Sequence, residues 1–419
     1  MLLESRTIVD EVRALLPRWA ERAARAEADR RLDPRTAEEL TAIGAHRLLQ
    51  PHRYGGGAAG FAAYAEVVAA VGEACTSAAW CLAVWSAHNW MLALFDPLAQ
   101  DDIWGPNPAA RISASIVPRV RFERTADGDV VVGGRFPFGS GCDHADWFGV
   151  GGIVPGPDGR DDRVIAMLPS AQTVIEHDTW QVMGLRGTGS KDVMVPEGTV
   201  VPAHRVLSVG AAAQGLAPGQ FDGAETMLFA PFRPVAMLVL APPVIGAARA
   251  ALDRFGTRST DHLVGMARRP QRQDLAAAFR VAESSAEIDA AALVLQRAAT
   301  DLDRMGRHAV HGGNARSGGG DGGDGNEVGG NGSAAGGQRV APSALEAATV
   351  LRDTAFSVRL CARAVDRLYE ASGGSALAAD EPMQRYWRDV HAARTHTALT
   401  WDAAADEYAA AWSAAAPAS

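Results

Sequence analysis

Residues 112–132 read ISASIVPRVRFERTADGDVVV, and the pattern of the chain changes at this stretch. Residues 112–116 alternate between apolar and small polar side chains, as a strand with one buried face does. Two further β-like runs, 122–125 and 130–132, lie on either side of Asp127 and Gly128, a pair typical of a hairpin turn. The stretch therefore predicts that a β domain begins here.

Further short β-like runs follow at residues 147–154, 164–168, 173–175 and 192–195. Short strands separated by Gly, Pro and Asp are typical of a compact barrel or sandwich of roughly a hundred residues. Helical patterning lies on both sides of this region. We therefore expect an N-terminal helical domain at residues 1–108, a central β domain at 109–220 and a C-terminal helical bundle at 221–419.

The helical parts carry their own signals. Residues 9–28 have apolar side chains at helical spacing, and Asp33 with Pro34 opens a second helix, with Pro34 at its first position. Residues 61–94 form a long, apolar, Ala-rich stretch, typical of buried helices. Residues 312–337 are rich in Gly with Ser, Asn and Asp, which predicts a flexible loop between two helices.

The overall charge excludes several classes of partner. The chain has 419 residues and a formal net charge of −9, so it offers no broad footprint for nucleic acid or an anionic membrane. The most apolar run, residues 234–251, is interrupted by Pro242 and Pro243 and falls short of a membrane span.

The cysteines are scattered without CxxC spacing, which argues against a disulfide framework and a structural zinc site. They are Cys75, Cys81, Cys142 and Cys361. No metal site is expected, and a reduced, cytoplasmic setting fits this pattern.

Two loops of small residues are either plain turns or ligand-binding loops, and composition slightly favours turns. They are residues 139–144, GSGCDH, and residues 184–191, GLRGTGSK. The second loop has the outline of a P-loop, but Ser190 precedes Lys191 where the reverse order is required, so that interpretation fails.

Four histidines are candidates for chemistry: His88, His144, His391 and His396. On residue type alone, each is more often a packed or surface residue than a catalytic one. His391 and His396 are five positions apart, which is poor geometry for a shared metal on one helix.

Taken in order, seven stretches resemble the flavin-dependent monooxygenases of the acyl-CoA dehydrogenase superfamily, such as the oxygenase components of 4-hydroxyphenylacetate 3-hydroxylase and of 3-HSA hydroxylase. The stretches are residues 51–56, 77–80, 88–90, 138–144, 180–192, 201–208 and 385–396. The resemblance covers nearly the whole chain except the Gly-rich segment and residues 214–223. It implies an N-terminal helical domain, a central β-barrel and a C-terminal four-helix bundle. It also implies a homotetramer, built as a dimer of dimers, with flavin between barrel and bundle near a subunit interface.

The choice within this superfamily lies between dehydrogenase and oxygenase. Acyl-CoA dehydrogenases use a glutamate shortly after an Arg-Asp pair, whereas here Arg388 and Asp389 are followed by Thr397 at about that position. A threonine cannot act as that base at neutral pH. A desaturase of the acyl-CoA dehydrogenase type therefore stays an alternative, as do an N-oxygenase of an amino sugar or amine and a non-catalytic member that binds no flavin.

The resemblance implies an oxygenase component that hydroxylates an aromatic or polyketide-like molecule through a flavin C4a-hydroperoxide. It implies O2 and reduced flavin, FMNH2 or FADH2, supplied by a separate NAD(P)H:flavin reductase. A neutral histidine suits removal of a phenolic proton. The match gives this role to His396, with His391 as the close alternative, and places His88 on the other side of the substrate.

The remaining site residues are also implied by the match. Ser140 would hold substrate or flavin, although relatives often have Ser-Ser-Gly where this chain has Gly139, Ser140 and Gly141. The flavin ring would be lined by Trp180, Arg186, Gly187, Thr188, Gly189 and Ser190.

Overall fold

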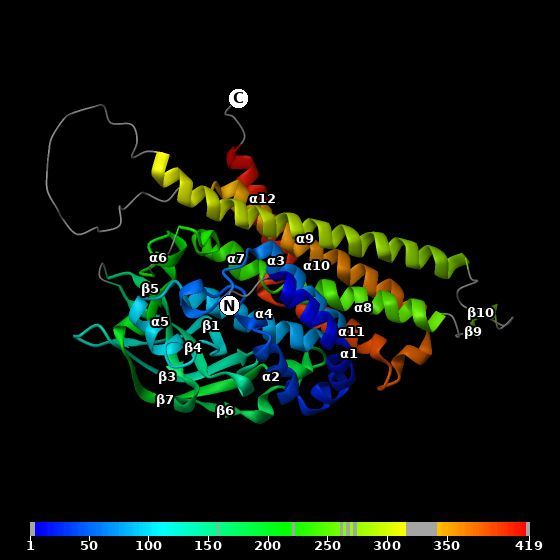
Figure 1. Cartoon of the computed structure of the whole chain (residues 1–419), viewed down its shortest axis with the longest axis horizontal. Helices are drawn as coiled ribbons and strands as arrows, with labels where there is room; N and C mark the ends of the chain where they lie inside the picture. Colours follow the sequence, from blue (N-terminus) through cyan, green and yellow to red (C-terminus); the bar gives the residue numbers. More distant parts are fainter. Residues whose placement is uncertain are drawn as a thin grey trace.

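Helices, then strands, then helices follow one another along the chain (Figure 1). The computed structural model describes residues 5–156, 159–219, 223–259, 263–264, 269–270, 275–315 and 342–415. In Figure 1 the strands lie together on one side of the molecule, and the long helices α9 and α10 cross the opposite side. This order agrees with the one predicted from the sequence.

The N-terminal part consists of helices α1 (Ser5–Asp29), α2 (Pro34–Ala42), α3 (Phe61–Ala74), α4 (Thr76–Leu92) and α5 (Pro97–Trp104). As predicted, Pro34 starts α2, and the Asp33 carboxylate caps it by accepting from the N–H of Arg35. The apolar stretch 61–94 is not one helix, because Cys75 adopts an extended conformation, with φ −153° and ψ 107°, between α3 and α4.

The β domain consists of two four-stranded sheets. Their orders are β1-β4-β5-β8 and β2-β3-β7-β6. The strands are β1 (Ile112–Arg121), β2 (Glu123–Arg124), β3 (Val130–Gly139), β4 (Trp147–Pro155), β5 (Asp161–Pro169), β6 (Val174–Glu176), β7 (Lys191–Val201) and β8 (Val206–Ser208). The predicted hairpin joins β2 to β3, with Gly128 at φ +91°. The two sheets are not joined by pairing among the described strands, so the closed barrel that the resemblance implied is not confirmed.

The C-terminal part consists of α6 (Val209–Ala213), α7 (Phe232–Leu238), α8 (Pro242–Ser259), α9 (Leu275–Ala315), α10 (Ala344–Ala371), α11 (Pro382–Ala393) and α12 (Trp401–Ala415), with a short pair β9 (Leu263–Val264) and β10 (Arg269–Pro270). The predicted Gly-rich loop, residues 312–337, begins too early, because α9 continues to Ala315. The rest of that loop lies outside the described residues.

The segment Phe232–Arg258 is long and apolar enough to cross a membrane by composition alone. However, 78% of its apolar window is buried inside the fold, as in the core helix of a globular protein. It is also divided into α7 and α8, and Pro242 starts the second helix. The segment is therefore a core element of this structure.

Candidate functional site

The register of two strands brings the two small-residue loops together. In the antiparallel pair of β3 and β7, Gly139 lies opposite Lys191. Ser140 follows β3 and Ser190 precedes β7, so the two serines are neighbours across the pair. Their hydroxyl oxygens are 2.7 Å apart, and the Thr188 hydroxyl lies 2.6 Å from that of Ser190. We call Ser140, Ser190 and Thr188 the hydroxyl chain.

The hydroxyl chain has one consistent direction of donation. Thr188 Oγ1 donates its single proton to the carbonyl of Leu185 at 2.7 Å, so Ser190 must donate to Thr188. Ser140 must then donate to Ser190, and its own oxygen accepts from the indole N–H of Trp80 at 3.2 Å. The three hydroxyls are buried. Each donates to the next, so the hydrogen bonds run in one direction from the Trp80 indole to the Leu185 carbonyl.

One side of α4 faces the hydroxyl chain. Trp80, Cys81 and His88 lie at spacings that place them on the same side of a helix. The Cys81 thiol contacts the carbonyl of Thr188, with sulfur and oxygen 3.6 Å apart. His88 Nδ1 lies 3.0 Å from the carbonyl of Ile112, and the next residue, Ser113, donates to the carbonyl of Ser140 at 2.7 Å.

His88 is neutral in this environment. A carbonyl can only accept, so Nδ1 of His88 carries the proton and Nε2 keeps its lone pair. Burial lowers the pKa of His88 to about 4, so the ring stays uncharged at neutral pH. The structure thus connects His88 to Ser140 through the start of β1.

His396 stands on the other side of the Trp80 indole. The two rings meet edge to face, with centroids 5.7 Å apart. His396 Nδ1 accepts from the N–H of Ala398 at 3.2 Å, so the neutral ring carries its proton on Nε2. The side chain is accessible to solvent, yet surrounding protein lowers its pKa. Trp80 therefore joins His396 to the hydroxyl chain.

His391 belongs to a different cluster. Its Nε2 lies 2.7 Å from an Asp366 oxygen, which also accepts from the Trp387 indole at 2.7 Å, and its ring packs on that indole. Asp389, two residues earlier on α11, contacts Leu185 beside the hydroxyl chain. Residues two apart on a helix are nearly opposite, so His391 faces away from this loop.

The loop before β7 is shaped mainly by protein contacts. The Trp180 indole donates to the carbonyls of Leu185 and Arg186 at 3.3 and 3.1 Å. A Cβ on Gly187 would lie 3.1 Å from Ser77, and one on Gly189 would lie 2.5 Å from the Asp143 carboxylate. Packing therefore leaves little room for a side chain at Gly187, and at Gly189 a side chain would displace the Asp143 carboxylate. Arg186 is partly exposed at the start of the turn.

An aromatic surface lies next to the hydroxyl chain. Phe138 is 59% exposed and has φ +64°, and its ring meets that of Trp180 at 87° with centroids 6.3 Å apart. An exposed aromatic pair beside buried hydroxyls fits a flat heteroaromatic ring with polar edges, such as that of flavin. Sequence reasoning missed Phe138 and the role of Trp80, although both lie inside stretches that match the family, at 138–144 and 77–80.

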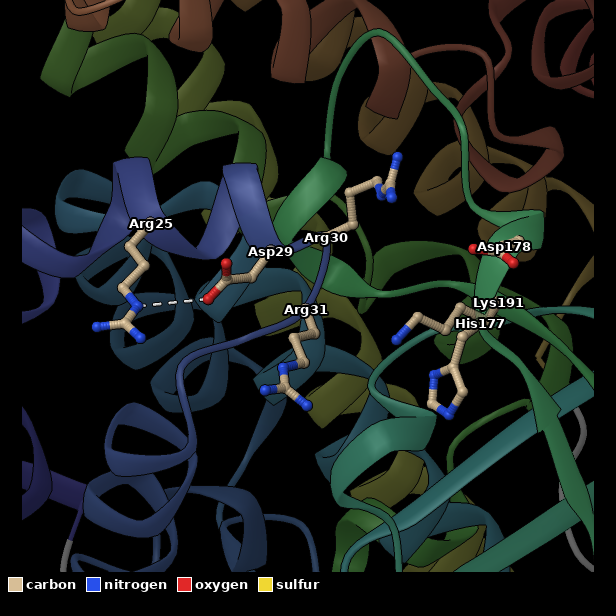
Figure 2. A pocket seen from close by; sticks show the side chains of 7 residues that line it. All are labelled: Arg25, Asp29, Arg30, Arg31, His177, Asp178 and Lys191. Carbon is tan, nitrogen blue, oxygen red and sulfur yellow. Dashed lines mark hydrogen bonds and ion pairs between the residues drawn. The ribbon is translucent and has the colours of Figure 1, made fainter.

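A cavity of about 390 Å³ opens on the outer side of the same loop (Figure 2). It is lined by Arg25, Asp29, Arg30, Arg31, His177, Asp178 and Lys191. Lys191 lines the cavity, whereas the preceding residue, Ser190, belongs to the hydroxyl chain. The Lys191 ammonium is paired with Asp143 at 2.5 Å, and Arg25 with Asp29 at 3.4 Å. These charged walls do not suit a flavin ring.

Comparison with known proteins places the chain in a family. A model described as acyl-CoA dehydrogenase, N-terminal domain, matches residues 3–107. A model described as acyl-CoA dehydrogenase, C-terminal domain, matches residues 238–316 and 330–401. The chain therefore belongs to the acyl-CoA dehydrogenase family, as the sequence motifs indicated.

Its relatives within that family are oxygenase components. The oxygenase subunit HsaA of a flavin-dependent monooxygenase from Rhodococcus jostii (strain RHA1) is 34% identical, with 92% of each chain covered. The oxygenase component of the FADH(2)-dependent resorcinol hydroxylase from Rhizobium sp. (strain MTP-10005) is 31% identical, covering 94% of this chain and 91% of the relative. The crystal structure of 3-HSA hydroxylase from Rhodococcus sp. RHA1 has a TM-score of 0.84, 31% identity and 98% coverage of both chains.

Proposed function

We propose that the chain is the oxygenase component of a two-component flavin-dependent monooxygenase that hydroxylates a phenolic aromatic compound. The observation that carries this proposal is the placement of Trp80, whose N–H bonds the hydroxyl chain while its ring contacts His396. This arrangement brings neutral hydrogen-bonding groups and an imidazole to one aromatic site. Relatives named for resorcinol and p-hydroxyphenylacetate support a phenol as the substrate class.

Reduced flavin, FMNH2 or FADH2, supplies the electrons with which one oxygen atom of O2 enters the substrate and the other leaves as water. In this proposal Phe138 and Trp180 flank the flavin ring, and Ser140 bonds its polar edge or the substrate. Thr188 and Ser190 hold Ser140 in place through the hydroxyl chain. The apolar residues of α4 exclude water from the reacting groups.

His396 is proposed to act on the substrate hydroxyl. In the tautomer set by Ala398, its Nε2–H donates to the phenol oxygen and stabilises the phenolate. For His396 to take the proton itself, the ring must release the contact between Nδ1 and Ala398. When His396 only donates, the phenol proton must pass to another acceptor, and His88, whose Nε2 keeps a lone pair, is proposed for it.

The alternatives have weaker support. An N-oxygenase of an amine favours an acidic pocket, whereas the ring of His396 contacts the Trp80 indole, which in turn bonds neutral hydroxyls. A desaturase needs a carboxylate base where this chain has Thr397, which is exposed.

We further propose a homotetramer in a cytoplasmic, reducing setting, with a separate NAD(P)H:flavin reductase as the partner. The four cysteines are free and buried, which suits that setting. Three large apolar side chains of α9, Leu275, Phe279 and Leu293, are 69%, 66% and 72% exposed and could be covered in an assembly.

Turnover with labelled oxygen tests the proposed function. The purified chain is mixed with a flavin reductase, NADH, FMN or FAD, and resorcinol or a related phenol under ¹⁸O2. We expect a product with one added ¹⁸O atom, and none without the reductase. Product formed from NADH by the chain alone would contradict the two-component proposal. Tight binding of oxidised flavin with O2-independent turnover of a thioester would favour the desaturase.

A further inference from the structure

Helix α11 contacts three consecutive residues of the loop before β7, which are Met183, Gly184 and Leu185. Arg388 donates to the carbonyl of Met183, and the Asp389 carboxylate accepts from the N–H of Leu185 at 2.6 Å. Between these contacts, Gly184 lies so close to α11 that a Cβ would be 2.1 Å from the carbonyl of Arg388. We call Arg388 and Asp389 the α11 clamp.

The Leu185 peptide is the point where the α11 clamp meets the hydroxyl chain. Its N–H donates to Asp389, and its carbonyl accepts from the Thr188 hydroxyl at 2.7 Å. Leu185 has φ +53°, a left-handed conformation that is unfavourable for a residue with a side chain. Surrounding contacts must hold such a residue in place, and Asp389 supplies the one to its N–H.

The same helix determines where His396 lies. α11 ends at Ala393, and His396 caps the short turn Thr397–Leu399 directly after it. Arg388 also contacts Glu27 of α1, which ties α11 to the N-terminal helices. A single helix thus sets both the imidazole and the loop that carries Thr188 and Ser190.

We propose that Asp389 is a positioning residue, which sets the hydroxyl chain relative to His396 through the Leu185 peptide. This inference rests on the proposed monooxygenase function for its effect on turnover. Its structural part, that Asp389 holds residues 183–190, is independent of any reaction. Asp389 itself is buried, with 4% of its surface exposed, so it acts through Leu185 and not on the substrate.

The test compares Asp389→Ala with Asp389→Asn, because Asn keeps an oxygen that can accept from Leu185. Asp303→Ala is the matched control. Asp303 is also a buried carboxylate that accepts from backbone N–H groups, those of Phe61 and Ala62, but it lies on α9 and caps α3. Two quantities are measured: amide hydrogen exchange without flavin, and product formed per flavin oxidised with reductase and a phenol present.

For Asp389→Ala we expect exchange in a peptide covering residues 181–192 to rise about tenfold, since a local contact is lost. Product per flavin should fall about fivefold or more while H2O2 rises. This corresponds to a change of roughly 1 kcal/mol in the competition between oxygen transfer and H2O2 release. Asp389→Asn should restore both quantities. Asp303→Ala should raise exchange at the start of α3 and lower the melting temperature, with product per flavin unchanged.

The inference is overturned if Asp389→Ala leaves exchange at residues 181–192 unchanged, or if the folded Asp303→Ala variant uncouples equally. If the wild type makes no product, the proposed function fails, while the exchange result still decides the structural part. If Asp389→Ala does not fold, Arg388→Gln takes its place, since it removes the contact to Met183. If amide hydrogen exchange and product per flavin are both unchanged in that variant, the inference that the α11 clamp holds the loop is overturned.

Discussion

The indole N–H of Trp80 donates to the hydroxyl of Ser140 at 3.2 Å, at one end of the hydroxyl chain whose direction the Leu185 carbonyl sets at the other. Since each hydroxyl carries one proton, the donor at one end and the Leu185 carbonyl at the other leave a single arrangement. The lone pairs that remain on Ser140 and Ser190 are therefore held in fixed directions. A site of this kind is preorganised before any cofactor or substrate binds.

Replacing Trp80 with Phe should remove this donor and keep an aromatic ring beside His396. A lost hydrogen bond of about 0.5–1.5 kcal/mol corresponds to a roughly 2- to 10-fold loss in reduced-flavin affinity or product yield. Anaerobic titration and product analysis measure the two quantities. Trp90→Phe is the matched control, because that indole lies on the same helix and donates to the Met227 carbonyl at 3.0 Å. Equal effects of the two variants would show that Ser140 does not need the donor.

Replacing His396 with Ala should slow oxygen transfer to the substrate by roughly 10² to 10⁴, the usual range for a positioned acid–base group. Flavin oxidation should continue, with H2O2 as its product. His396→Gln separates the two roles, since its amide N–H can donate like Nε2 but cannot take a proton. A partly active Gln variant supports donation to a phenolate, and an inactive one supports the base.

His391→Ala is the control for His396→Ala. It should lower stability, because the contacts to Asp366 and Trp387 are lost, and leave product per flavin unchanged. Thermal melts and product yields of the same preparations measure both effects. Uncoupling by His391→Ala but not by His396→Ala would transfer the catalytic role to His391.

The yield of product should depend on pH through His396. The protein packed around His396 lowers its pKa, so the ring is neutral at pH 7 and becomes protonated only below the ordinary value of about 6.5. If His396 acts as the base, product per flavin should therefore be constant from about pH 7 to 8 and fall in more acidic buffer, whereas a donating Nε2–H is kept when the ring is protonated. His88, with a pKa of about 4, stays neutral over this range. If His396→Gln shows the same fall in product per flavin at acidic pH, the fall belongs to another group.

Asp389 should make stability depend on pH in a predictable direction. Burial raises the pKa of Asp389 to about 6, above the ordinary value near 3.9, so the folded state binds a proton more readily than the unfolded state. Wild type should therefore gain stability relative to Asp389→Asn as pH falls from 7 to 4.5, by about 1–3 kcal/mol. Melting curves of both proteins at several pH values measure this difference. A constant difference would contradict the raised pKa.

Gly184→Ala should displace the loop before β7, because its added Cβ would meet α11. The added Cβ would lie 2.1 Å from the Arg388 carbonyl, so backbone must move, at a cost of about 1–3 kcal/mol. We expect a lower melting temperature and weaker binding of reduced flavin. Gly256→Ala is the control, because its Cβ would meet nothing within 4 Å in α8, and a change of about 1 kcal/mol or less in either direction is expected. Normal flavin binding by Gly184→Ala would show that the loop tolerates the shift.

Local patterns in the sequence predicted several elements correctly because their causes are local. The Asp127 and Gly128 pair predicted the hairpin of β2 and β3, and Asp33 with Pro34 predicted the start of α2. The stretch 61–94 forms buried helices as expected, but the extended backbone at Cys75 that divides it into α3 and α4 is not apparent from hydrophobic periodicity. The end of α9 was also placed too early, because glycine composition disfavours a helix without excluding one.

The sequence by itself determined the order of helices, strands and helices, the two small-residue loops, and the family motifs that single out Ser140 and three histidines, His88, His391 and His396. Tertiary structure alone decided that His396, and not His391, contacts Trp80, and that Asp389 bonds Leu185 across 204 positions of the chain. The physical reason is directional. Each residue along a helix turns the side chain by about 100°, and strand register decides which hydroxyls meet, so packing between distant segments selects the partners.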